Sequence, residues 1–300
     1  MPIHVKLALA TILWGGTPTI GRYLAHYEAA ELITFGRFVV ASIFLFVVAS
    51  KQQNLFARFA LSDLPLYVAL GLTGICMHNV LMFWGLEHAD ATRGSIIMGF
   101  ISIMVAVMEF IFFGIRLSKL AVGGIVIGFL GLAIVVSEGK LGEVFTQGVG
   151  FGDLLLLGSA LGWAIYSVIS RPVLSRITPL DLTAFACITG TLLLIPMLAQ
   201  DLPTAKTMML DPMALGLISL SGLFATGFGY MWYYEGVKLL GSVGTVMYVN
   251  LIPIVGVVIA GIALHEIPSL AATLGGVFVV AGVILVNREN SNQKPLSDQD

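Results

Sequence analysis

The chain has 300 residues, of which 58% are apolar and 11% charged, and its mean hydropathy is +0.97. This composition excludes an ordinary water-soluble protein and predicts an all-α integral membrane protein. Fifteen Lys and Arg against 17 Asp and Glu give a net charge of −2, so a partner such as nucleic acid is excluded as well.

Apolar stretches long enough to cross a bilayer, which takes about 20 residues, occur ten times along the chain. They cover residues 5–22, 31–50, 65–86, 93–114, 120–137, 151–170, 181–199, 213–234, 242–263 and 270–287. The polar breaks between them are too short for a soluble domain. We expect the first stretch to be a transmembrane helix and not a removed signal peptide, because no small-residue cleavage site follows it. Residues 288–300 are predicted to form a disordered cytoplasmic tail.

Orientation follows from the Lys and Arg residues on alternate sides of these spans. One side carries ten, namely Lys6, Lys51, Arg58, Arg116, Lys119, Arg171, Arg176, Lys238, Arg288 and Lys294. The other side carries four, namely Arg22, Arg93, Lys140 and Lys206. This bias predicts that both termini are cytoplasmic.

The two halves of the chain, residues 1–140 and 148–287, repeat each other. Trp14 and Arg22 have counterparts in Trp163 and Arg171 at an offset of 149 residues. Gly124 and Gly131 of span 120–137 correspond to Gly275 and Gly282 of span 270–287, at an offset of 151 residues. Five helices are an odd number, so the second unit enters the membrane from the opposite face. Inverted repeats are typical of transporters with a site at the midplane.

Four features of the sequence belong together: the segment Leu13–Arg22, Pro253 after Tyr248-Val-Asn250, the segment Leu264–Ser269, and the closing GGVFVVAGVILV. In these features the chain resembles the drug/metabolite transporter superfamily, specifically its EamA-type members, over residues 5–287. The resemblance implies ten helices in two five-helix repeats, and the aromatic-rich interior is most similar to bacterial aromatic amino acid exporters. One departure is that Ser102 stands in the first repeat where the second has Pro253.

Two tryptophans are the sharpest candidates for substrate contact. Trp14 lies about nine residues into its span and Trp163 about twelve, which at ~1.5 Å per residue puts both near mid-membrane. Facing rings would suit a flat, partly apolar substrate, although a midspan Trp can also fill a gap between helices. Other aromatic residues are expected in interfacial belts, in the list Trp84, Tyr23, Tyr27 and Tyr67.

Polar and adaptable side chains at helical spacing predict a cavity lining, with close helix packing as the alternative. The further substrate-binding candidates are His78, Asn79, Met82, Met98, Tyr166, Tyr230 and Asn250. Pro253 removes a backbone donor and should bend its helix beside Asn250, so we assign helix breaks or gating to Pro18 and Pro253.

Two charged residues lie well inside spans. Arg37 is at nearly the depth of His78, which would suit a substrate carboxylate, although snorkelling to the outer surface is the favoured interpretation. Glu109 lies seven residues before Arg116, and we expect it to meet Arg116 or water.

No catalytic motif, metal cluster or cofactor-binding loop is found, so an enzyme, a metal and a cofactor are not predicted. Cys76 and Cys187 are 111 residues apart in apolar runs and are interpreted as buried packing residues.

We therefore predict a monomeric multi-pass transporter of a bacterial inner (plasma) membrane, surrounded by lipid, that exports a small amphiphilic metabolite, most simply an aromatic or hydrophobic amino acid. Because the midplane offers no obvious proton-carrying residue, uncoupled alternating access is expected. One alternative is a proton-coupled exporter of drugs or cationic metabolites. Another, from a different class, is a membrane sensor or integral-membrane enzyme.

Overall fold

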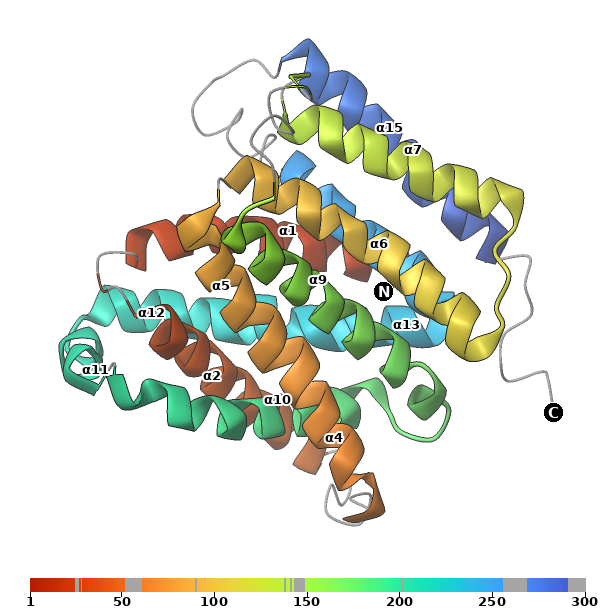
Figure 1. Ribbon diagram of the computed structural model, residues 1–300. Helices are drawn as coiled ribbons and strands as arrows, with labels where there is room; N and C mark the ends of the chain where they lie inside the picture. The colour runs from red at the N-terminus through yellow and green to blue at the C-terminus, as the bar shows by residue number, and fades with distance from the viewer. Residues whose placement is uncertain are drawn as a thin grey trace.

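The structure, a computed structural model, describes residues 1–24, 27, 29–51, 61–89, 91–137, 139–140, 142, 149–200, 202–255 and 269–290. Every regular element in these ranges is helical (Figure 1). The first half contains α1 (Ile3–Leu24), α2 (Ala30–Lys51), η2 (Leu61–Asp63), α4 (Leu64–Leu70), η3 (Gly71–Met77), α5 (His78–His88), α6 (Ala91–Phe113) and α7 (Lys119–Val136). The second half contains α9 (Phe151–Ser170), η4 (Pro172–Ser175), α10 (Pro179–Leu194), η5 (Ile195–Gln200), α11 (Leu202–Met209), α12 (Pro212–Leu220), η6 (Ser221–Phe228), α13 (Gly229–Val246), η7 (Met247–Leu251) and α15 (Leu270–Asn290).

The described helices agree with a membrane protein. Six of them are long and apolar enough to cross a bilayer, and three shorter apolar helices accompany them. One of the six, Pro212–Val255, is 44 residues long and contains the predicted span 213–234 and the first part of the predicted span 242–263. It is interrupted at Gly241, whose φ of 74° is disfavoured for residues with a Cβ atom. The second of these two spans is described only as far as Val255.

Local sequence signals account for several helix starts. Ser118 caps α7, since its side chain accepts a hydrogen bond from the Ala121 amide. Thr178 does the same for α10, where Pro179 occupies the first helical position. Asp211 caps α12 by accepting from the Met213 amide. Each of these short polar breaks therefore marks where the next helix begins.

Two segments differ in extent from the sequence prediction. The break between α10 and α12 contains the short helix α11, and Met208 of this helix is buried in a small cluster with Leu24, Ile33, Ala214 and Ile218. Burial of its apolar side gives this break a reason to be helical. At the other end of the chain α15 extends to Asn290, beyond the predicted limit of 287, and residues 291–300 of the expected tail lie outside the described part.

Two π-helices occupy matching places in the two halves. η3 joins α4 to α5, and η6 joins α12 to α13. Their first residues, Gly71 and Ser221, are 150 positions apart, the offset of the sequence repeat. π-helical turns are rare in proteins, and many of those that occur lie at functional sites. The pair of π-helices at equivalent positions therefore indicates one candidate functional segment in each half.

The helices α7 and α15 lie side by side along one edge of the bundle, outside α6 (Figure 1). Glycines bring their backbones together: a Cβ atom on Gly131 would lie 2.6 Å from the Gly275 carbonyl oxygen, and one on Gly282 would lie 2.6 Å from the Gly124 carbonyl oxygen. Gly124 corresponds to Gly275 in the sequence repeat, and Gly131 corresponds to Gly282. The two contacts would be exchanged by a twofold axis between the helices. Small residues at such crossings are the usual packing device of membrane helices.

Candidate functional site

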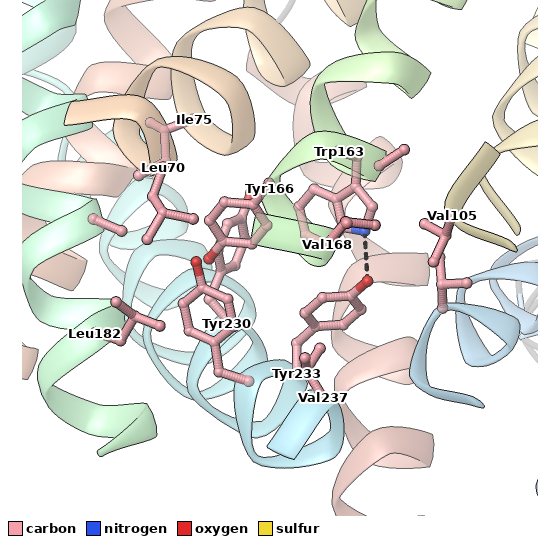
Figure 2. Packing of buried hydrophobic residues seen from close by; sticks show 14 of the residues in the cluster. Leu70, Ile75, Val105, Trp163, Tyr166, Val168, Leu182, Tyr230, Tyr233 and Val237 are labelled. Atoms are coloured by element: carbon pink, nitrogen blue, oxygen red, sulfur yellow. Dashed lines mark hydrogen bonds between the residues drawn. The ribbon is translucent and has the colours of Figure 1, made fainter. Parts of the chain in front are cut away.

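Trp14 of α1 and Trp163 of α9 meet in the interior. Their ring centroids are 5.7 Å apart and their planes stand at 88°, an edge-to-face contact. Each indole N–H has an acceptor, as burial demands: Trp14 donates to the Ala225 carbonyl of η6 at 2.8 Å, and Trp163 donates to the Tyr233 hydroxyl at 3.1 Å (Figure 2). The two residues that the repeat pairs in sequence are thus paired in space.

Tyrosines of α13 and α9 complete an aromatic cluster around this pair, defined as Trp14, Trp163, Tyr166, Tyr230, Tyr233 and Tyr234. Figure 2 shows four of these residues, Trp163, Tyr166, Tyr230 and Tyr233. Tyr230 stands edge-on to Trp163 at 5.2 Å, and Tyr166 stacks on Tyr234 at 4.8 Å. The rings pack against one another, and their role as a cavity lining stays a prediction.

Tyr233 was missed by the sequence analysis although it is fully buried. Its hydroxyl bonds both Trp163 and the Ser167 hydroxyl, the latter at 2.6 Å. The signal was available, because Tyr233 lies three residues after Tyr230 on the same helix and so shares its face.

His78 and Asn79 begin α5, directly after η3, and both reach the aromatic cluster. The His78 ring lies 4.6 Å from Trp163, and its Nδ1 lies 3.1 Å from the Ser159 hydroxyl. Asn79 donates to the Ile75 carbonyl of η3 at 2.9 Å and to the Tyr230 hydroxyl at 3.5 Å. Two polar side chains that directly follow η3 therefore contact the aromatic cluster.

Asn250 lies in η7, a 3₁₀ segment directly before Pro253. The backbone is thus irregular where the proline was expected to disturb it. The buried Asn250 amide donates to the Ser102 hydroxyl of α6 at 3.1 Å, so in this conformation it links two helices. Pro18, the other predicted break, lies within the unbroken helix α1, and its side chain is outside the described part.

The two candidate methionines differ in placement. Met98 of α6 packs against the main core, which contains the aromatic cluster. Met82 of α5 is partly exposed, and it is not among the described residues that pack on that core. The structure therefore brings Met98, but not Met82, to the central cluster.

Arg37 corrects the expectation of snorkelling. Its side chain is buried in the bundle, with a relative exposure of 6%. It donates to the Thr226 hydroxyl of η6 at 3.3 Å, and the Arg37 backbone is tightly packed against Gly222 of the same π-helix. The close contact between α2 and η6 directs the guanidinium inward.

Glu109 is also corrected. Its carboxylate is fully buried and forms an ion pair with Arg171 at the end of α9, and not with Arg116 or water. Arg116 lies in the exposed connection after α6. The prediction failed because it considered neighbours along the chain, whereas α6 and α9 are packed side by side.

All three ion pairs of the described residues lie at the end of the bundle that the charge bias predicts to be cytoplasmic. Lys6 pairs with Glu235, Glu109 with Arg171, and Asp63 with Arg176. The last pair has two parallel hydrogen bonds of 2.7 Å, and its contact with Asp63 raises the pKa of Arg176. Near these pairs, His4 Nδ1 of α1 lies 2.6 Å from the Tyr248 hydroxyl of η7. These contacts tie α1 to α13 and η7, and α6 to α9, at one end.

The expected interfacial belt holds only in part. Trp84 is exposed at 37%, and its N–H donates to Glu31 at 2.7 Å, as suits a belt residue. Tyr67 is wrong for a belt, because it is fully buried and stacks on Phe185 at 4.6 Å. Tyr27 is partly buried and donates to Asp211 at 2.8 Å, and the Tyr23 side chain lies outside the described part. Cys76 and Cys187 are free and buried, as predicted.

Apolar membrane-length helices around a polar and aromatic centre, with irregular helices beside that centre, define a multi-pass membrane transporter. The sequence profile of the EamA-like transporter family matches residues 1–137 and 150–288, so the chain belongs to this family.

Relatives agree with this assignment. The uncharacterized transporter YyaM of Bacillus subtilis is 25% identical, with 97% of each chain covered. The probable terminal-alkyne amino-acid exporter of Streptantibioticus cattleyicolor is 26% identical, with 96% of this chain and 94% of the relative covered. A solved crystal structure shares the fold with a TM-score of 0.71 at 16% identity, over 97% of this chain and 99% of that one.

Proposed function

We propose that this protein exports small amphiphilic metabolites, with aromatic or hydrophobic amino acids as the substrate class, and that it does so by alternating access of two inverted five-helix repeats. In this proposal ten helices cross the inner membrane, both termini are cytoplasmic, and the monomer is functional without a cofactor or a catalytic activity. The observation that carries the proposal is the meeting of Trp14 and Trp163, one from each repeat, within a single aromatic cluster.

The inverted-repeat part of the proposal is supported by several reciprocal features. The π-helices η3 and η6 fall at equivalent positions. The glycine contacts between α7 and α15 obey a twofold relation, and Ser42 of α2 meets Thr191 of α10, 149 positions later, at 3.2 Å between their hydroxyl oxygens. Contacts between equivalent residues are expected on or beside the axis that relates two repeats.

The substrate class is supported by the chemistry of the cluster. Edge-to-face rings bind a flat apolar group, and the adjacent tyrosine, histidine and asparagine side chains can bond its polar end. The name of the Streptantibioticus relative also refers to an amino-acid exporter.

Alternating access needs one end of the site to be closed at a time. The contacts His4–Tyr248, Lys6–Glu235 and Glu109–Arg171 gather at the end predicted to be cytoplasmic. We interpret them as the closed cytoplasmic gate of an outward-directed conformation. Opening of this gate would break the contacts together.

Coupling is proposed to be absent. A zwitterionic amino acid has no net charge, so its own gradient can drive export from a cell that overproduces it. Glu109 is more deeply buried than the sequence analysis assumed, but its charge is matched by Arg171 in the gate. The rival is proton antiport of a drug or cationic metabolite, for which Glu109 and His78 are the residues to examine.

The test uses purified protein in liposomes, with counterflow of labelled tryptophan, phenylalanine, leucine and a cationic dye. We expect tryptophan and phenylalanine to exchange. Trp163→Ala should lower their exchange by about tenfold or more, through loss of ring contacts and of the bond to Tyr233. The matched control Trp84→Ala, which removes an exposed tryptophan, should retain most activity.

Two results would contradict the proposal. Exchange of the dye without any amino acid would favour the drug exporter. Amino acid accumulation that follows an imposed pH gradient, and that is lost in Glu109→Gln or His78→Ala, would show proton coupling.

A further inference from the structure

The guanidinium of Arg37 is a buried charge without an acidic partner. No described carboxylate lies within ion-pair distance of it, its Nε has no hydrogen-bond partner, and its bond to the neutral Thr226 hydroxyl is long, at 3.3 Å. Ionisable residues inside a membrane bundle normally pair with one another or serve a substrate pathway. An unpaired guanidinium at this depth therefore calls for a negatively charged ligand.

A second unpartnered group lies one turn away on the same helix. The Thr34 hydroxyl is buried, with a relative exposure of 1%, and has no hydrogen-bond partner. Residues three apart share a face of an α-helix, so Thr34 and Arg37 point the same way from α2. Burial of both without partners costs stability unless a ligand supplies acceptors. A carboxylate, with its two oxygens, can accept from both.

The surroundings of Arg37 lie beside the aromatic cluster. The next residue of α2, Phe38, stands edge-on to Tyr230 at 5.7 Å. Thr226, which accepts from Arg37, follows Ala225, whose carbonyl accepts from Trp14. One segment of η6 thus contacts both the guanidinium and a tryptophan of the pair.

We infer that Arg37, with Thr34 and Thr226, binds the carboxylate of the substrate while the tryptophan pair holds its apolar part. This inference rests on the proposed function for the nature of the substrate, but the binding site itself does not require transport. According to this inference, the group that the protein recognises is an anionic carboxylate, and an amine that lacks a carboxylate is a poor ligand. A bidentate guanidinium contact with a carboxylate has the geometry that arginine favours.

The experiment measures binding separately from transport. Thermal stabilisation of the purified protein in detergent is recorded with tryptophan, with indole-3-propionate, which keeps the carboxylate alone, and with tryptamine, which keeps the amine alone. The wild-type protein should be stabilised by the two carboxylates and at least tenfold more weakly by tryptamine.

Arg37→Gln should weaken binding of both carboxylates by about tenfold or more and leave tryptamine unchanged. Thr34→Val should weaken carboxylate binding by a few-fold. The matched control Ser42→Ala removes a polar contact from the same helix and should leave all three affinities unchanged. Arg37→Lys keeps the charge and serves if Arg37→Gln does not fold; it should retain carboxylate binding in part.

Equal loss of all three ligands in Arg37→Gln, or in Arg37→Lys where only that variant folds, would overturn the inference and make Arg37 a packing residue. Wild-type protein that prefers tryptamine, or that binds neither carboxylate, would overturn it as well. Carboxylate binding that depends on Arg37 in a protein that does not exchange amino acids in liposomes would support the site and refute the proposed export.

Discussion

The two halves of this transporter share their scaffold and differ in their polar side chains. Both have a π-helix at the same position, a tryptophan in the central pair and two glycines in the crossing of α7 with α15. His78 in the first half corresponds to Gly229 in the second, at an offset of 151. The position that corresponds to Glu109 at the same offset is Ala260, which lies outside the described part.

This difference separates two kinds of role. Features that occur in both halves fit what a pair of related helix bundles needs in order to pack together. For features that occur once, such as the buried Arg37 and the Glu109–Arg171 pair, we propose roles in the direction of transport and in ligand binding. The predictions below test this separation, and they run from the largest expected effect to the smallest.

The shared scaffold should be the most sensitive part. Gly131→Val should destabilise the protein by about 2–3 kcal/mol or more, because its Cβ atom would lie 2.6 Å from the Gly275 carbonyl oxygen and the backbones would have to separate. The measurement is the melting temperature and the monodisperse fraction in detergent. Gly123→Val is the control on the same helix, since a Cβ atom there meets open space. Equal loss in both variants would mean that the crossing tolerates separation.

Substitutions in the proposed cytoplasmic gate should cost less stability than Gly131→Val. Glu109→Gln leaves the Arg171 guanidinium without its partner, and we expect a loss of about 1–3 kcal/mol, below the range for fully buried pairs because Arg171 is partly exposed. The double variant Glu109→Gln, Arg171→Gln should recover part of this loss. In both, a cysteine at Ser167 should react faster with an impermeant maleimide from the cytoplasmic side. Unchanged reactivity in either variant would contradict a gating role.

The outermost ion pair should matter least. Asp63→Asn removes a bidentate partner from Arg176, whose side chain is 56% exposed, so we expect a smaller loss of stability than in Glu109→Gln. It should shrink further in 0.5 M salt, since exposed charges are screened. The check is a melting curve at low and at high salt. A loss as large as that of Glu109→Gln would place this pair in the gate.

Much of the helical layout could be predicted from the sequence, because length and hydropathy alone select membrane spans. The paired tryptophans could also be predicted, since the repeat singles them out and their span positions give their depth. Their contact across the two halves follows once the halves are related by a twofold axis.

The π-helices could not be predicted, since their residues are as apolar as those of an α-helix. They change which residues share a face. Gly71, Gly74 and Gly85 of span 65–86 are spaced as residues on one face of an α-helix are. In the structure Gly71 faces Gly190 of α10, whereas Gly74 and Gly85 face α9.

Which helices pack side by side could not be predicted from the sequence either. The sequence gives the depth of Glu109 and of Arg171 but not that their helices are adjacent. Span 31–50 is apolar on nearly every face, so nothing in it showed that Arg37 points into the bundle. The pairing of Glu109 with Arg171, 62 residues later, can be seen only in the packed structure. The same holds for the direction of Arg37, because its helix has no polar face that would mark the buried side.

The two native cysteines have a practical consequence for spectroscopy. Cys76 and Cys187 are exposed by only 7% and 0%, and neither lies at a helix end that is proposed to open. Probes attached to cysteines introduced at the two membrane faces should therefore report with little background from the native thiols. Distances between such labels could then follow the motion of each half with Cys76 and Cys187 left in place, without first engineering a cysteine-free version.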